Sequence, residues 1–130
     1  VNLREEKARL DFLGYTFSWA RNWRKGGYHY WRAEPSRKAL KKERKKLNEI
    51  TGTGTGYKPI PILVAELNRN LKGWANYFSY GHSKEAYREI NWYVQTRLFF
   101  HLKRRSQRRY RIPEGSTLYR EARKLGVVYL

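Results

Sequence analysis

The sequence predicts a mainly α-helical protein, in which a β-hairpin precedes a bundle of three helices and a short helix lies near the C-terminus. Two observations predict this order. An early stretch is dense in aromatic and β-branched residues around a Gly-Gly turn, and the chain after it repeats apolar residues every three to four positions. With 130 residues, the chain can bury one modest core.

Residues 10–33 are expected to form the hairpin. Aromatic and β-branched residues fill both of its halves, and the turn-rich RNWRKGG separates them. Strand alternation places four apolar side chains on one face of the first strand, namely Leu13, Tyr15, Phe17 and Trp19. An isolated pair of strands is only marginally stable, so we expect this hairpin to pack on a partner sheet.

A first helix should begin after Ser36, which can cap it, and run to about Ile50. Its inner seam is narrow and consists of Leu40, Glu43, Leu47 and Ile50. The broad opposite face carries five lysines, namely Lys38, Lys41, Lys42, Lys45 and Lys46. The Gly-Thr repeat at 52–56 follows this helix and lacks a succeeding Lys-Ser or Lys-Thr, which favours an interhelical linker over a phosphate cradle.

The lysine face has two interpretations. Charged helix faces are usually only solvated. The whole chain, however, carries 29 Lys and Arg against 11 Asp and Glu, a net charge of +18, which attracts polyanions. We therefore expect the lysine face to contact phosphates of a nucleic acid, with an anionic membrane surface as the second choice.

The second helix, at about 61–78, has the clearest apolar stripe in the chain. Its predicted core side chains are Leu67, Leu71, Trp74 and Phe78. Replacing Trp74 by alanine should therefore lower the free energy of unfolding by about 3–5 kcal/mol. Gly73 lies on the far side of the helix, where a glycine costs about 1 kcal/mol relative to alanine and hints at close approach by another backbone.

A third helix should follow Ser83 and run to about Arg105. Ile90 and Val94 define its core side together with Tyr87, Tyr93 and Leu98, whereas Trp92 and Phe99 lie opposite. Arg97 and His101 project from the apolar side, and we expect a structural salt bridge for Arg97.

A basic cluster surrounds Tyr110 after the third helix and comprises Lys103, Arg104, Arg105, Arg108, Arg109 and Arg111. Arginines next to an aromatic ring offer phosphate contacts and a stacking plane, so this cluster is a second candidate RNA-binding element. A short helix is expected from Ser116 to Leu125, with Gly126 just past its end. The final VVYL should be a closing strand or a hydrophobic plug.

The sequence predicts no catalytic centre in this chain. Asp11 is its one aspartate, and the ten glutamates are scattered, whereas two-metal phosphoryl transfer needs clustered carboxylates. The three histidines lack metal-site spacing, and cysteine is absent. We therefore expect no metal and no cofactor in this chain. The absence of a membrane-length apolar run and of a signal peptide predicts an intracellular, cytoplasmic protein. Methionine is absent even at position 1, which favours a piece of a longer protein.

Three sequence elements in this order resemble group II intron reverse transcriptases. The first is Phe12-Leu13-Gly14-Tyr15-Thr16-Phe17, and the second is Pro35-Ser36 opening a basic helix. The third is Leu67-Asn68 followed by Leu71-Lys72-Gly73-Trp74-Ala75-Asn76-Tyr77-Phe78. The similarity covers nearly the whole chain, although residues 106–130 match less sharply.

The resemblance implies a division of the chain. Residues 1–33 would be the end of a palm domain, with a primer-grip-like element at Phe12, Leu13, Gly14 and Tyr15. Residues 34–105 would be the thumb, also called the maturase-specific or X domain, and 106–130 a basic C-terminal extension with a short helix. The three-helix bundle would then be thumb-like. The catalytic Tyr-x-Asp-Asp strand and the fingers of the family are not in this sequence.

The resemblance also implies a function. The chain would be the RNA-binding thumb of an RNA-directed DNA polymerase, a nucleotidyltransferase encoded by a mobile element. It would grip template-primer duplex and intron RNA to support cDNA synthesis and RNA splicing. Its partners would be structured RNA and the remaining palm and fingers, and Mg²⁺ is expected in that palm. The alternatives are a free-standing basic RNA-binding structural protein and the thumb of a CRISPR-associated reverse transcriptase, with peripheral membrane binding ranked below both.

Overall fold

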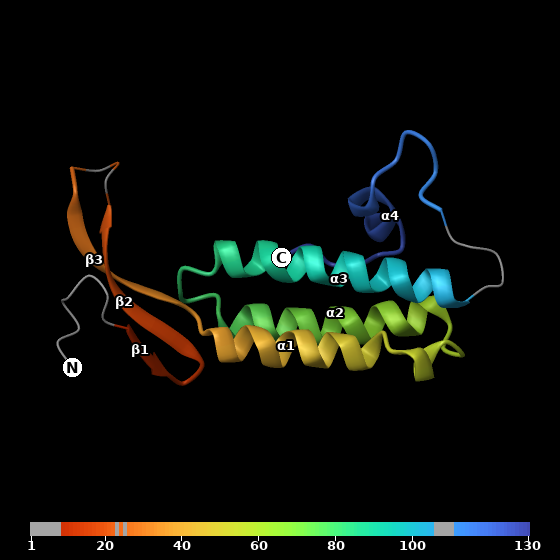
Figure 1. Cartoon of the computed structure of the whole chain (residues 1–130), viewed down its shortest axis with the longest axis horizontal. Helices are drawn as coiled ribbons and strands as arrows, with labels where there is room; N and C mark the ends of the chain where they lie inside the picture. The colour runs from red at the N-terminus through yellow and green to blue at the C-terminus, as the bar shows by residue number, and fades with distance from the viewer. Residues whose placement is uncertain (1–8, 23, 25, 106–110) are drawn as a thin grey trace.

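The computed structural model describes residues 9–22, 24, 26–105 and 111–130. Figure 1 shows three long helices lying side by side along the long axis, with an antiparallel sheet beyond one end of the bundle and a short helix next to α3. The predicted fold class is therefore confirmed. The helices are α1 (Arg37–Ile50), α2 (Ile60–Tyr77), α3 (Lys84–Arg105) and α4 (Leu118–Lys124), and a 3-10 turn, η2 (Thr53–Thr55), lies between α1 and α2.

The sheet has three strands, β1 (Arg9–Phe12), β2 (Tyr15–Asn22) and β3 (Tyr28–Pro35), in the order β1-β2-β3. The prediction of one continuous first strand is wrong, because the chain reverses at Leu13 and Gly14. Both have positive φ, 52° and 85°, and Phe12 pairs with Tyr15, which defines a two-residue hairpin turn. Leu13 is consequently 69% exposed at the turn and does not share a strand face with Tyr15.

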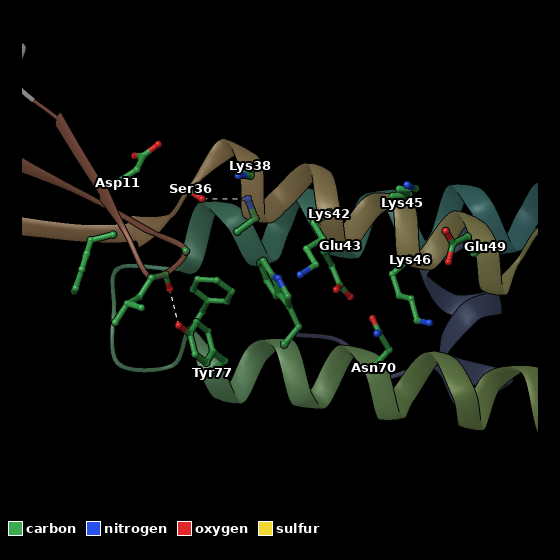
Figure 2. A pocket seen from close by; sticks show the side chains of 16 residues that line it. Asp11, Ser36, Lys38, Lys42, Glu43, Lys45, Lys46, Glu49, Asn70 and Tyr77 are labelled. Atoms are coloured by element: carbon green, nitrogen blue, oxygen red, sulfur yellow. Dashed lines mark hydrogen bonds between the residues drawn. The ribbon is translucent and has the colours of Figure 1, made fainter.

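Hydrogen bonds join this turn to the helices. The Ser36 amide donates to the Gly14 carbonyl at 2.8 Å. The Tyr15 hydroxyl donates to the Tyr77 carbonyl at 2.6 Å. The Tyr77 hydroxyl donates back to the Leu13 carbonyl at 2.5 Å, and Figure 2 shows this second bond. The expected partner sheet is thus replaced by a third strand within the chain and by the end of the helical bundle.

The loop between α2 and α3 fastens the sheet at a second point. The His82 amide donates to the Ala33 carbonyl at 2.5 Å, and the Ala33 amide donates to His82 Nδ1 at 3.2 Å. A Cβ atom at Gly81 would lie 2.7 Å from the Ala33 oxygen and 2.9 Å from the Tyr15 ring. Only glycine allows the loop to approach β3 this closely, so the sequence at this joint fixes the position of the sheet.

The core lies between the three long helices. Predicted core residues Leu67, Leu71, Phe78, Ile90 and Val94 are each at most 3% exposed. Trp74 is only partly buried and packs against the core from its edge.

The C-terminal segment completes the same core. Ala122 of α4 and Val127 are buried in it. The Asn68 side chain donates to the Gly126 carbonyl at 2.9 Å and accepts from the Val128 amide at 2.8 Å. The final residues therefore form a plug, and the alternative of a closing strand is wrong.

The salt bridge predicted for Arg97 is not found among the described residues. In that part of the chain, Arg97 Nε and His101 Nε2 are buried without a hydrogen-bond partner. His101 Nδ1 lies 3.4 Å from the Thr51 carbonyl. Burial lowers the pKa of His101, which keeps this ring neutral near pH 7 and avoids a second buried cation.

Gly73 has no close neighbour in the described structure, so the expected approach of another backbone is not found there. A Cβ atom at this position would meet no atom within 4 Å, and the residue is exposed to solvent and lies away from both ends of α2. We therefore predict that Gly73→Ala raises the free energy of unfolding by about 0.5–1 kcal/mol, through lower backbone entropy of the unfolded chain. Urea unfolding of both proteins measures this, and a lower midpoint for the alanine variant would contradict it.

None of the helices in the described part of the chain is long and apolar enough to cross a membrane.

Candidate nucleic-acid interface

A groove runs between α1 and α2, and the β1–β2 turn closes one end of it. The end next to the turn is a hollow of about 910 Å³, and a second hollow of about 650 Å³ continues it along the two helices. Four side chains line both hollows, namely Glu43, Lys46, Asn70 and Trp74. We call this continuous surface the α1–α2 groove (Figure 2).

The lysine face of α1 forms one wall of this groove. The predicted RNA-binding residues Lys38, Lys42, Lys45 and Lys46 all line the hollow next to the turn, and Lys41 is exposed outside it. The lysines of α1 face away from the bundle, whereas two arginines of the same helix face α3. Arg37 and Arg44 lie 3.5 and 3.8 Å from Glu89 of α3.

Glu43 is a buried carboxyl group in the wall of a strongly basic groove. It is 5% exposed, and burial raises its pKa to about 7, against a smaller opposite effect from Lys46. Figure 2 shows it pointing from α1 toward Asn70 of α2. Near pH 7 this carboxyl therefore exists in both its neutral and its ionised form.

Aromatic residues form the floor of the groove near the turn. The Trp74 ring lies 4.8 Å from the ring of Phe78 and 5.9 Å from that of Tyr87, measured between centroids. The primer-grip-like residues Phe12 and Leu13 line the same hollow and are 59% and 69% exposed. Gly14 also lines it, whereas Tyr15 packs under the turn, 4.9 Å from Phe78. The structure thus brings the predicted turn element and the lysine face to one surface.

The arginine cluster is separate from this groove in the described residues. Arg104 donates to the Thr51 carbonyl at 2.7 Å, and Arg105 donates to the Lys58 carbonyl, so both tie α3 to the α1–α2 loop. Lys103 lies over the Phe99 ring, 4.6 Å from its centroid. The predicted residues Arg108 and Arg109 lie outside the described residues.

Sequence reasoning missed the contribution of α2 to the groove. Arg69 and Asn70 line it opposite the lysines, although neither belongs to a charge run or to an apolar stripe. The helical wheel could have indicated only part of this, because Asn70 flanks the stripe that contains Trp74, whereas Arg69 lies opposite the centre of that stripe.

No metal centre can be assigned to the residues that the structure describes. Within 9–22, 24, 26–105 and 111–130, no three His, Asp or Glu side chains come together to hold an ion.

Comparison with protein families gives a match, and it covers most of the helical part of the chain. Residues 40–115 match the family model of the group II intron maturase-specific domain. The chain belongs to this family. The match spans more than half of the maturase chain, from α1 through α3 to the segment before α4. A comparison of this chain with curated proteins gives no match.

Proposed function

We propose that this maturase-specific domain binds structured RNA through the α1–α2 groove. The observation that carries the proposal is the gathering of four lysines from one helix beside exposed aromatic side chains, on a wall that the bundle holds rigid. Phosphates are the anions that such a row of ammonium groups neutralises, and aromatic rings contact bases. Membership of the group II intron maturase family supports RNA as the partner.

Within a complete protein, we propose that the domain acts as the thumb of an RNA-directed DNA polymerase. The groove would hold template-primer duplex during cDNA synthesis, and intron RNA during splicing. The turn at Phe12 and Leu13 would then face the primer end, because it closes the groove at one end. The palm and fingers, with their Mg²⁺, would supply the chemistry.

The first test removes charge from the groove. In Lys38→Ala/Lys42→Ala/Lys45→Ala, affinity for RNA should fall similarly for all RNA sequences. The slope of log affinity against log salt should become shallower by about 2 to 3, because up to three phosphate contacts are lost. Fluorescence anisotropy with labelled RNA at several salt concentrations measures both quantities. The three side chains are exposed, so the fold should persist.

A matched control removes the same charge elsewhere. Lys72, Lys84 and Arg123 are exposed on three other helices, and none lines the α1–α2 groove. Their joint replacement by alanine should change affinity and salt slope less than the α1 variant does. Equal losses in the two variants would show that the net charge of the chain, and not the groove, binds the RNA.

A further inference from the structure

The two hollows of the groove join at three side chains that line both hollows, namely Glu43, Asn70 and Trp74. Asn70 and Trp74 are one turn apart on α2, and Glu43 points toward Asn70 from α1. An RNA strand following the groove from the turn toward Arg69 passes these three side chains. The joined hollows are large enough for a small ligand group such as a nucleobase.

The polar pair at this point is arranged to accept hydrogen bonds. The amide nitrogen of Asn70 faces Glu43 and donates to both carboxylate oxygens, and the distance from this nitrogen to Oε2 is 3.2 Å. The carbonyl oxygen of Asn70 then points away from Glu43. An ionised carboxylate has about four acceptor positions, so Glu43 retains capacity for two further donors. The complementary ligand group is one that carries two adjacent N–H donors.

Trp74 supplies a flat surface next to this pair. Phe78 and Tyr87 pack on part of its indole, and the side chain is only partly buried where it lines the groove. Nucleobases stack on such rings. Lys42 and Lys46 flank Glu43 on α1 and point into the same space in Figure 2, where they can neutralise a phosphate attached to the stacked base.

We propose that this part of the groove binds one unpaired guanine nucleotide, with the base on Trp74 and its N1–H and N2–H groups donated to the Glu43 carboxylate. Guanine is the RNA base whose Watson–Crick edge carries two adjacent N–H donors. The base is unpaired because pairing would occupy that edge. This inference rests on the proposed RNA-binding function and adds to it the kind of nucleotide that the groove selects.

The proposal makes guanine recognition dependent on pH. Only the ionised carboxylate accepts both N–H groups, and the carboxyl of Glu43 titrates near neutrality because it is buried. The other charged groups that line the same hollows are Lys38, Lys42, Lys45, Lys46 and Glu49 of α1, Glu66 and Arg69 of α2, and Asp11 of β1. Guanine binding therefore competes with protonation of Glu43 and weakens as the pH falls from 8 to 6.

The test uses the full chain and three RNA hairpins that share one stem. One hairpin ends in an unpaired 3′ guanosine, the second in an unpaired 3′ inosine, which lacks the N2 amino group, and the third is blunt. Each affinity is expressed relative to the blunt hairpin. At pH 8 the guanosine hairpin should bind about tenfold tighter than the inosine hairpin, since one of two hydrogen bonds to the carboxylate is lost. At pH 6 this preference should largely disappear.

Two variants locate the effect. Glu43→Gln should abolish both the guanosine preference and its pH dependence, because the amide replaces one acceptor oxygen by an NH2 donor, which opposes one of the two N–H groups of guanine, and does not titrate in this range. Glu114→Gln removes the same charge from an exposed position outside the groove and should keep the preference. Circular dichroism spectra of both variants verify the fold.

The outcomes separate this inference from the proposed function. If no hairpin binds with salt dependence, RNA binding itself is wrong. If all three bind equally well and respond to the lysine replacements, RNA binding stands and the guanine site is overturned. A guanosine preference that persists in Glu43→Gln would also overturn it.

Discussion

Raising the salt concentration from about 50 to about 200 mM should weaken RNA binding by a factor of about 10³ or more. The reason is the number of cations on one surface. Five lysines of α1 and Arg69 of α2 lie in or beside the α1–α2 groove, which allows about six phosphate contacts. Each contact releases a counterion from the RNA, so the losses multiply. Anisotropy titrations of the full chain with a labelled stem-loop measure the effect.

The form of the salt response also carries information. A linear decline of log affinity with log salt indicates phosphate neutralisation, and its slope counts the contacts. A nearly flat response would contradict the groove as an electrostatic surface and would leave stacking on the aromatic residues as the main source of affinity. Stacking contacts neutralise no phosphate, so they leave that slope nearly unchanged.

The helices and their buried faces were predictable because a periodic pattern determines them. The seam of α1 and the stripe of α2 place leucines at helical spacing, and Leu47 and Leu67 are both fully buried. The lysine face followed from the same geometry, since residues opposite a buried seam must face outward. Ser36, predicted as the cap of α1, accepts the Ala39 amide through its hydroxyl at 3.1 Å.

Features that depend on contacts between distant segments were not predictable. Leu13 adopts a positive φ that leucine rarely takes, and tertiary hydrogen bonds from Tyr77 and Ser36 hold this turn in place. Likewise, the helical wheel placed Glu43 in an apolar seam but could not show that Asn70 of α2 faces it. The groove itself arises only when α1 and α2 are packed together.

Trp74 illustrates the limit of the helical wheel most clearly. The wheel places it within the apolar stripe, yet its side chain lies at the edge of the core and lines the groove. Truncating a partly buried side chain loses less buried apolar surface than truncating a fully buried one. The expected cost of Trp74→Ala is therefore about 2 kcal/mol, lower than the sequence alone predicts.

Leu67→Ala should have the largest effect on stability, about 3 kcal/mol of unfolding free energy and a melting temperature lower by about 10 °C. Leu67 is 0% exposed in the middle of α2, so its loss leaves a cavity that the neighbouring helices cannot easily fill. Thermal and urea unfolding monitored by circular dichroism measure both quantities. A loss below about 1 kcal/mol would show that the core repacks around the alanine.

The same variant separates stability from recognition when it is compared with Trp74→Ala. Leu67 does not line the groove, so at a temperature where Leu67→Ala is folded its RNA affinity should match that of the parent chain. Trp74→Ala is the less destabilised of the two, but it removes the flat surface of the groove and should bind RNA more weakly. If affinity instead follows stability across both variants, Trp74 supports binding only through the fold, and base stacking on it is excluded.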